Sequence, residues 1–299
     1  LMARVVMPAG VMTTSQARAL SRIARDYAQG RLSITTRQTI QLHWLKLGAI
    51  ADLMRDLAKV ELSTFHGCGD VARNTVACPW ASICPHARID VAPFAKRVAD
   101  RLAKARELDN LPRKFKIAFS GCPADCAQPH INCAGLTAIA RALPGGGEQL
   151  GFRVRIGGGM GWKPFQAEPL YSFVPPEAAD GLCHAIGMLY RDHGDRFNRA
   201  TSRLKFVVAR QGIEFCRRVV EYNLSALGVD ASAFETTPAA DCRPAPPARP
   251  FAGANPINRR GLAIERLMVP QGEMNFHQFK RVAELDRGLA GHPVVAVGP

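Results

Sequence analysis

SGCPADCAQPHINCAG, residues 120–135, is the most informative stretch of the chain because it places two thiols in a turn. Cys122 and Cys126 are separated by three residues, and the Gly, Pro and Asp around them favour irregular backbone. A disulfide, a zinc site, a redox pair and an iron-sulfur cluster would each use such thiols, and each requires different residues elsewhere. The rest of the chain therefore has to distinguish these uses.

The composition is that of an ordinary globular protein. At 299 residues with 47% apolar content, the chain can form one large or two medium domains. It contains no run of about eighteen apolar residues and no secretory signal, so we expect no membrane partner and a cytoplasmic location. Nine cysteines over this length do not suggest the disulfide framework of a small secreted domain. Leu1 before Met2 and the apolar end VVAVGP suggest a segment of a longer chain.

The net charge of +14 indicates a partner or ligand of opposite sign. Nucleic acid is not the expected partner, because the 39 Lys and Arg are spread along the chain without a basic tail or a recognisable nucleic-acid-binding motif. A polyanionic cofactor, an anionic substrate and an acidic protein partner would each account for the excess.

Hydrophobic periodicity predicts an α+β protein. The expected strands cover residues 4–7, 31–45, 114–120, 136–143 and 151–159. One expected helix begins after the N-cap candidates at residues 13–15. The other expected helices cover residues 50–57, 93–108, 177–190 and 213–223. The glycine cluster at 157–161 matches no nucleotide-binding motif, so we interpret it as a turn or as close backbone approach to a large cofactor.

An internal repeat spans most of the chain. Residues 237–250, TPAADCRPAPPARP, contain five prolines and predict a linker. Beyond it, residues 267–291 resemble residues 5–30 at an offset of 262. The matched pairs are Pro8 with Pro270, Gly10 with Gly272, Met12 with Met274 and Gln16 with Gln278. The chain therefore holds one whole unit and the start of another.

Two upstream thiols join the pair in the opening stretch. Cys78 and Cys84 in CPWASIC form C-x5-C, and Cys122 and Cys126 form C-x3-C. Zinc sites usually use tighter pairs and redox dithiols use C-x-x-C. A cubane cluster needs four thiolates on loops that can surround it, and both pairs lie in irregular Pro-rich backbone. Spacing alone leaves a cluster, a zinc site and unrelated buried cysteines open.

Four motifs in order carry a resemblance. They are TTRQTIQLH, VARNTVACPWASIC, LPRKFKIAFSGCPADC and FRVRIGGGMG. Together they resemble the siroheme-dependent nitrite and sulfite reductase family, over nearly the whole chain. The resemblance implies ferredoxin-like half-domains and an α/β domain that binds a 4Fe-4S cluster and siroheme. We therefore expect half-domains at 1–68 and 257–299, the cofactor domain at 69–236 and the linker at 237–256.

The resemblance also implies six-electron reduction of sulfite to sulfide or of nitrite to ammonia, with residues matched by motif position. The cluster ligands would be Cys78, Cys84, Cys122 and Cys126, with Cys126 also bridging to the siroheme iron. Electrons would pass from the cluster through Cys126 to the siroheme and then to an anion on its open face. The siroheme periphery would be held by Arg37, Gln41 and His43. The residues facing the substrate anion would be Arg4, Arg73, Lys114 and Lys116.

The residue types suit these assignments. Small oxyanions whose reduction consumes protons need fixed positive charges near an open metal position. Arg gives forked hydrogen bonds, whereas Lys can also supply protons. Lys114 and Lys116 are two apart on an expected strand, so both would point to one face, as in any one-sided strand. The eight carboxylates of siroheme would account for part of the net charge.

Two departures from the family pattern stand out. Family members often have an acidic residue at the position of Cys133, so its role is open, and neither Cys133 nor Cys68 is excluded as a replacement ligand. In the familiar fused members the anion-facing residues come from the first repeat and the cysteines from the second, whereas one repeat here carries both sets. A missing second half or a partner subunit would complete the site.

Three alternatives remain at this point. A precorrin-3B synthase-like enzyme shares the fold, a non-catalytic electron-transfer subunit would carry a cluster without siroheme, and a basic nucleic-acid-binding protein would carry structural zinc. The motifs do not distinguish sulfite from nitrite. No flavin- or nicotinamide-binding motif is evident, so we expect a separate electron donor, a ferredoxin or a flavoprotein.

Overall fold

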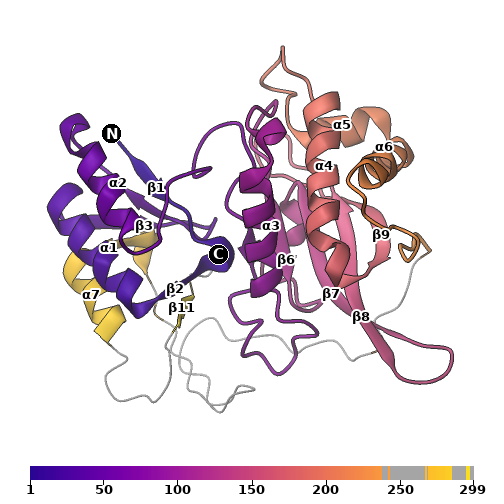
Figure 1. Ribbon diagram of the computed structural model, residues 1–299, viewed down its shortest axis with the longest axis horizontal. Coiled ribbons are helices and arrows are strands. Elements are labelled where there is room, and N and C mark those ends of the chain that lie inside the picture. The colour runs from indigo at the N-terminus through magenta and orange to yellow at the C-terminus, as the bar shows by residue number, and fades with distance from the viewer. Residues whose placement is uncertain (238–241, 243–266, 268, 285–293, 297–299) are drawn as a thin grey trace.

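The computed structural model describes residues 1–237, 242, 267, 269–284 and 294–296. They form two α+β units (Figure 1): a smaller one built from both ends of the described chain, and a larger one between them. The linker expected at 237–256 lies outside the described residues apart from Thr237 and Cys242. The domain boundaries expected from the sequence stay a prediction.

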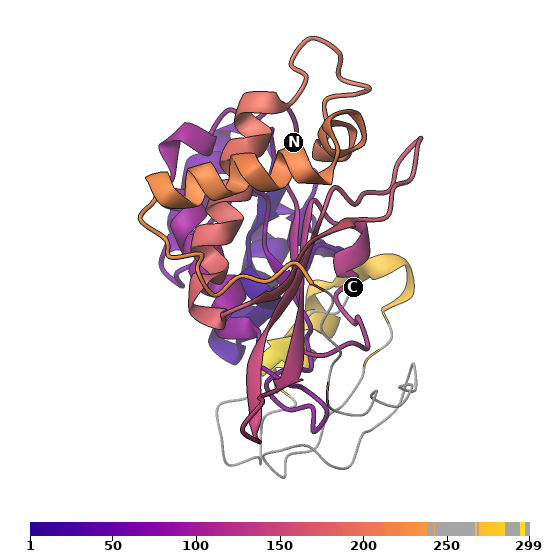
Figure 2. The same ribbon diagram turned by 90° about the vertical axis from the view of Figure 1, so that its right-hand side faces the viewer.

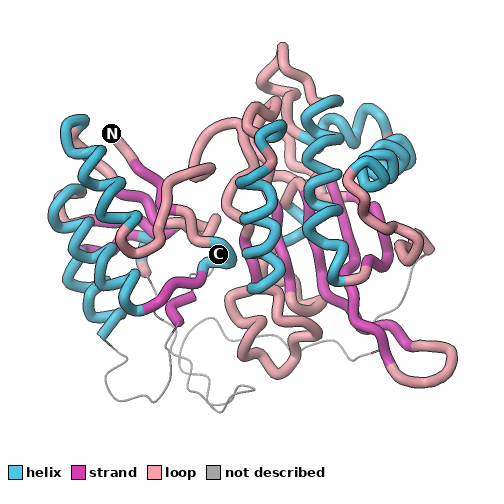
Figure 3. Tube along the Cα trace, in the orientation of Figure 1, coloured by secondary structure: helices cyan, strands magenta, loops and turns pink. Residues whose placement is uncertain are grey.

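The smaller unit is a four-stranded antiparallel sheet covered by three helices. Its strand order is β1 (Ala3–Val5), β4 (Ile40–Leu42), β3 (Arg31–Ile34) and β10 (Glu273–Asn275). Strands β2 (Val11–Thr13) and β11 (Val294–Ala296) form a separate two-stranded antiparallel sheet. Helix α1 (Thr14–Tyr27) packs against α2 (Ile50–Ala58) and α7 (Phe276–Glu284), as Figure 3 shows. The core of this unit includes Leu20 of α1 and Phe279 of α7.

The repeat seen in the sequence is also a structural repeat. Ala9 and Gln271 both have left-handed backbone, with φ of 62° and 56°. The amide of Gln16 donates to the hydroxyl of Thr13, which caps α1, and the amide of Gln278 donates to the side chain of Asn275 before α7. Because β10 pairs with β3 in the four-stranded sheet, the expected completion of one sheet by strands of both half-domains is confirmed. The pair of β11 with β2 forms a separate sheet.

The sequence predicts a single strand at residues 31–45, and this prediction is wrong because the segment forms a hairpin of two strands. β3 and β4 pair antiparallel, with Ile34 opposite Ile40. The turn between them is closed by the amide of Gln38, which donates to the carbonyl of Thr35 at 2.9 Å, and Gln38 adopts a φ of 54°. Arg37 therefore lies on a tight turn at the end of the sheet instead of along a strand.

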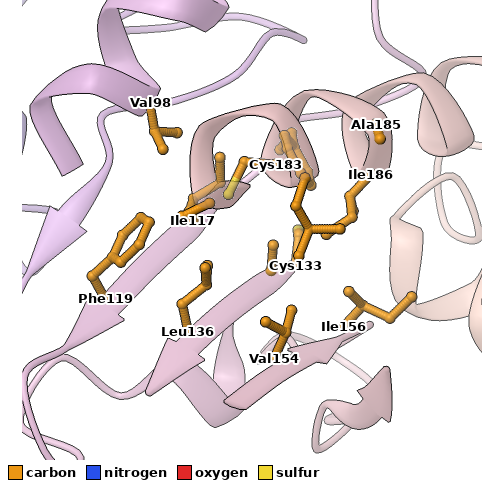
Figure 4. Close-up of a cluster of buried hydrophobic side chains, with 14 of the residues drawn as sticks. Val98, Ile117, Phe119, Cys133, Leu136, Val154, Ile156, Cys183, Ala185 and Ile186 are labelled. Carbon is orange, nitrogen blue, oxygen red and sulfur yellow. The ribbon is translucent and has the colours of Figure 1, made fainter. Parts of the chain in front are cut away.

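The larger unit is a five-stranded mixed sheet with helices packed on one face (Figure 2). Strands β5 (Val76–Ala77), β6 (Ile117–Ser120) and β7 (Ala134–Ala142) are parallel. Strands β8 (Glu148–Ile156) and β9 (Glu168–Val174) complete the sheet antiparallel. The helices are α3 (Ala92–Lys104), α4 (Ala179–His193), α5 (Leu204–Gln211) and α6 (Ile213–Ala226). Figure 4 shows apolar side chains of α4, such as Ile186, above Ile117 and Val154 of the sheet.

Three elements of the larger unit were not predicted from the sequence, and the start of β6 was predicted three residues too early. Strands β5 and β9 and helix α5 were not expected, since β5 is only two residues long and α5 is short. The strand expected at 114–120 begins at Ile117, so Lys114 and Lys116 lie in the extended segment before it. Phe115 and Ile117 are buried while the two lysines are half-buried, so the predicted alternation is confirmed. Among the described helices, none has the length and apolar character needed to cross a membrane.

Candidate cofactor and anion site

Four thiols lie on two loops that leave the large sheet at the same end. Cys78 directly follows β5, and Cys122 comes two residues after β6. Because β5 and β6 are parallel neighbours, their carboxyl ends lie side by side. The amide of Cys78 donates to the carbonyl of Phe119 in β6 at 2.8 Å, which holds the first loop against the second strand.

Gly121 lets the two thiol loops touch. Its carbonyl accepts the amide of Arg88 at 2.7 Å. A Cβ added at Gly121 would lie 2.9 Å from the carbonyl oxygen of Ile89 and 3.1 Å from the Cβ of Ala81, so a side chain there would push the loops apart. The C-x5-C pair is thus held beside the C-x3-C pair. Cys78, Cys84 and Cys122 are buried, and Cys126 is half-buried.

The donor set suits an iron-sulfur cluster in its chemistry. A single ion draws its thiolates to within about 2.3 Å of one point, whereas a cubane distributes four thiolates over four irons. Across the part of the chain that the structure describes, no three His, Cys, Asp or Glu side chains are gathered tightly enough for an ion. The assignment of Cys78, Cys84, Cys122 and Cys126 as cluster ligands stays a prediction.

The hairpin turn of the smaller unit docks on the strands that carry the thiols. Arg37 donates to the carbonyl oxygens of Asn74 at 2.5 Å and Ile117 at 3.1 Å, and to Oδ1 of Asn132 at 2.6 Å. The buried amide of Gln38 exchanges two hydrogen bonds with the backbone of Ala77, at 2.8 and 2.9 Å. Two consecutive turn residues therefore join the two units directly before Cys78.

The expected anion-facing residues gather around this junction. Arg4 donates to Oγ1 of Thr39 at 3.0 Å, and Arg73 donates to the carbonyls of Gly67 and Gly69, each at 3.0 Å. Burial, with a contribution from Arg4, lowers the pKa of Arg73. Burial, followed by Arg203 and Arg73, lowers the pKa of Lys114. Arg4, Arg73 and Lys114 therefore form part of one electrostatic group.

Lys116 and Arg37 are the most strongly perturbed cations of this group. Burial, with contributions from Arg37 and Arg203, lowers the pKa of Lys116 to about 8. Burial also lowers the pKa of Arg37 to about 10, and nearby cations act in the same direction. Burial and the neighbouring cations both destabilise the charged forms of these side chains. A bound anion would therefore stabilise them.

No described carboxylate forms an ion pair with this cation group, although the charge of Asp70 acts on Arg73 and Lys114 without direct contact. None of the ion pairs in the described chain involves Arg4, Arg37, Arg73, Lys114 or Lys116. The buried Nε atoms of Arg4 and Arg37 also have no hydrogen-bond partner among the described residues. Unpaired buried donors and uncompensated cations suit a polyanionic ligand such as siroheme, or a small oxyanion.

Comparison with protein families accounts for both halves of this arrangement. Residues 68–226 match the nitrite and sulphite reductase 4Fe-4S domain, and residues 1–60 match the nitrite/sulfite reductase ferredoxin-like half domain. The chain belongs to the nitrite and sulfite reductase family. Siroheme and a 4Fe-4S cluster are the cofactors of this family, as the sequence resemblance implied.

Individual relatives agree with the family match. An assimilatory ferredoxin-dependent nitrite reductase of Haloferax mediterranei is 36% identical over 247 residues, which are 77% of this chain and 42% of the relative. A ferredoxin sulfite reductase of Mycolicibacterium paratuberculosis is 31% identical, over 74% of this chain and 39% of the relative. The structure of the Mycobacterium tuberculosis NirA protein matches the whole chain with a TM-score of 0.85 at 25% identity and is itself 52% covered. The chain spans less than half the length of these two curated relatives.

Two cations that the sequence reasoning missed belong to the same group of this reductase-family chain. Arg203 donates to the sulfur of Cys133 at 3.5 Å, and its buried Nε has no described partner. Lys205 is only 3% exposed, and its ammonium group donates to the carbonyl oxygens of Gly159 and Lys163. The basic residues two apart in TSRLKF, before an apolar run, were the available signal.

Cys133 contacts the cation group, although it lies only seven residues after Cys126 in the sequence. It is fully buried, accepts a hydrogen bond from Arg203, and has its sulfur 3.9 Å from the carbonyl of Lys114. Cys68 is exposed. Where family members often carry an acidic residue, this chain therefore places a sulfur against a guanidinium group.

The glycine cluster approaches the protein's own backbone. A Cβ added at Gly158 would lie 2.4 Å from the carbonyl oxygen of His130 and 2.7 Å from that of Asn132, and one added at Gly157 would contact Val208 at 2.8 Å. These contacts are all within the chain, so the approach to a large cofactor that the sequence suggested stays a prediction.

Gly158→Ala is expected to lower the free energy of unfolding by about 1–3 kcal/mol, because the added methyl group overlaps two carbonyl oxygens. Gly145→Ala is the matched control, since a Cβ there meets nothing within 4 Å. Denaturant unfolding of both variants measures the difference. Equal stability of the two variants would contradict the packing described for Gly158.

Gln41 and His43 lie at the margin of the group. Gln41 is opposite Arg4 in the pairing of β1 with β4. His43 follows β4, and its Nε2 lies 3.2 Å from the side-chain amide of Gln41. Both are half-buried, so either can reach a ligand beside Arg4. Their predicted role at the siroheme periphery is untested and stays a prediction.

Proposed function

We propose that the chain takes part in the six-electron reduction of sulfite to sulfide, or of nitrite to ammonia. The observation that carries this proposal is the half-buried group of cations that has no ion pair with a carboxylate of the described chain. Arg73 and the two lysines precede β5 and β6, the strands that lead to the four-thiol loops, and Arg37 donates to the carbonyl of Ile117 in β6. Since the chain spans only part of its relatives, a second half or a partner subunit completes the site in this proposal.

The residues of the cation group divide the work by their chemistry. Arg4 and Arg73 bind and orient the oxyanion through forked hydrogen bonds. Lys114 and Lys116 hold protons close to it, and Lys116 does so with a pKa of about 8, closer to neutral pH than that of an ordinary lysine. Arg37 and Gln38 hold the two units together through hydrogen bonds to the backbone of the larger unit. When bound, the siroheme and cluster supply the electrons and the open metal position.

The cysteines would hold the cofactors. Cys78, Cys84, Cys122 and Cys126 would bind the cluster, and Cys126, the half-buried member, would face the siroheme. Arg37, Gln41 and His43 would meet siroheme carboxylates. The relatives named as ferredoxin-dependent support a ferredoxin as the separate electron donor, and the net charge of +14 suits such an acidic protein.

The absorption spectrum of the full-length protein purified without oxygen tests this proposal. We expect siroheme bands, together with iron and labile sulfide in the proportion of one cluster and one siroheme per site. Activity is then measured with sulfite and with nitrite as acceptors and reduced ferredoxin as donor. Cofactor-loaded protein that reduces neither anion, or properly loaded protein without siroheme bands and labile sulfide, would remove the proposal.

A further inference from the structure

The loop of residues 64–69 lies against both arginines that are expected to face the anion. The carbonyl oxygens of Gly67 and Gly69 accept hydrogen bonds from the guanidinium group of Arg73, each at 3.0 Å. The backbone of Gly67 also packs on Arg4, because a Cβ added at Gly67 would lie 2.5 Å from the carbonyl oxygen of Arg4. The position of this loop therefore fixes the direction in which Arg73 points.

One side chain of the loop ties it to the connection between α3 and β6. Nε2 of His66 donates to Oδ1 of Asp109 at 2.9 Å, and the His66 side chain is only 11% exposed. Its ring also stacks on that of Phe65, with the ring centroids 4.1 Å apart. Asp109 directly follows the short helix η3 (Arg106–Leu108), so this hydrogen bond joins two segments that are 43 residues apart in the sequence.

The backbone of His66 is left-handed, with a φ of 58°. Local conformation alone would favour Gly or Asn at such a position, because a Cβ makes the left-handed region unfavourable. The contacts of the His66 side chain offset this strain. A residue that is held in an unfavourable conformation by its surroundings often lies where the position of the backbone matters for function.

The histidine bond is the first of several between the segment that carries Arg73 and the segment that carries the lysines. Beyond it, the amide of Leu111 donates to the carbonyl of Asp70 at 2.8 Å, and the amide of Arg73 donates to the carbonyl of Phe115 at 2.8 Å. Lys114 directly precedes Phe115 in the chain. These bonds therefore align two of the expected anion-facing residues, Arg73 and Lys114, and the histidine bond closes the outer end of the alignment.

We propose that His66 is a positioning residue for the anion site: through its hydrogen bond to Asp109 it holds the loop whose carbonyls orient Arg73. The inference rests on the proposed function, in which Arg73 binds the sulfite or nitrite. His66 does not itself touch the anion in this arrangement. Its loss therefore weakens the binding of the anion more than it slows the turnover of the bound anion.

His66→Phe tests the inference because it keeps a ring against Phe65 and removes the nitrogen that donates to Asp109. In the full-length, cofactor-loaded enzyme we expect KM for the anion that the parent reduces to rise about five- to tenfold, with kcat within about twofold of the parent. We expect the same rise in the dissociation constant of that anion, measured without turnover from the absorption change of the oxidised protein. His66→Gln restores an N–H donor and should recover most of the parental KM.

Arg106→Ala is the matched control, since Arg106 contacts the other carboxylate oxygen of Asp109 at 3.4 Å and its side chain is 79% exposed. We expect its KM and dissociation constant to be parental. Asp109→Ala removes the histidine bond from the other side and keeps the test usable if His66→Phe does not fold. The double variant His66→Phe, Asp109→Ala should bind the anion no more weakly than either single variant, because both remove the same hydrogen bond.

A parental KM and dissociation constant in folded His66→Phe or Asp109→Ala would overturn the inference. An equal rise in His66→Phe and His66→Gln would also overturn it, because the donor nitrogen would then not matter. A lower melting temperature as the sole change would make His66 a structural residue instead. Inactivity of the loaded parent with both anions would remove the proposed function itself.

Discussion

Cys126→Ser is expected to leave less than about one-thousandth of the parent activity, because in the proposed site a serine hydroxyl would not replace the thiolate that binds the cluster and faces the siroheme. Cys126 is half-buried, whereas Cys78, Cys84 and Cys122 are buried, so it is the thiol best placed for a second group outside the loops. Activity with sulfite and nitrite, iron content and the magnetic coupling between cluster and siroheme are the measurements. We expect the coupling to be lost.

Two other cysteines serve as controls for this experiment. Cys68→Ser changes an exposed thiol and should keep cluster and activity. Cys133→Ser changes the sulfur beside Arg203 and should keep the iron and labile sulfide content, because Cys133 belongs to the cation group. Full activity of Cys126→Ser would exclude the bridging role. Loss of the cluster in Cys133→Ser would instead make Cys133 a ligand.

Lys116→Met is expected to lower kcat by about 10²–10³, because it would remove a proton donor and a positive charge from the proposed anion site. The pKa of Lys116 is lowered to about 8, with burial the largest cause and Arg37 next. Below this pH the ammonium group is charged and can donate a proton, and above it both properties are lost. We therefore expect the activity of the parent to fall as the pH rises through about 8, and Lys116→Met to lack this limb of the profile.

Lys116→Arg separates charge from proton donation. The guanidinium group keeps its charge at every accessible pH but does not release a proton. We expect KM for the anion within a few fold of the parent and a kcat close to that of Lys116→Met. Steady-state kinetics between about pH 6 and 9 measure both, with Arg22→Met, outside the site on α1, as a control for loss of charge. A parental pH profile in Lys116→Met would show that another group titrates.

The helices and the repeat could be predicted from the sequence because their signals are local. Thr13 and Gln16 form the capping box of α1, and the same arrangement recurs at Asn275 and Gln278. The long helices have one apolar face each, which periodicity detects. Strand β5 was missed since two residues carry no periodicity, and the hairpin at Arg37 was missed since its turn contains neither Gly nor Pro.

The site was predictable only as a set of residue types. The motifs predicted the four thiols and the cations Arg4, Arg37, Arg73, Lys114 and Lys116, because spacing and residue identity survive in a single sequence. Arg203 and Lys205 lie at the start of α5, far along the chain, and their spacing in TSRLKF did not show which residues they join in space.

The amino-acid sequence by itself determined the family, the repeat and the chemistry available: thiols for a cluster, and Arg and Lys for an anion. Only the tertiary structure decided that Arg37 and Gln38 join the two units, that Lys116 is held near a pKa of 8, and that the loop tied by His66 to Asp109 accepts hydrogen bonds from Arg73. The physical reason is that local conformation follows from neighbouring residues. Burial, the sum of nearby charges and the pairing of polar groups depend on segments far apart in the chain.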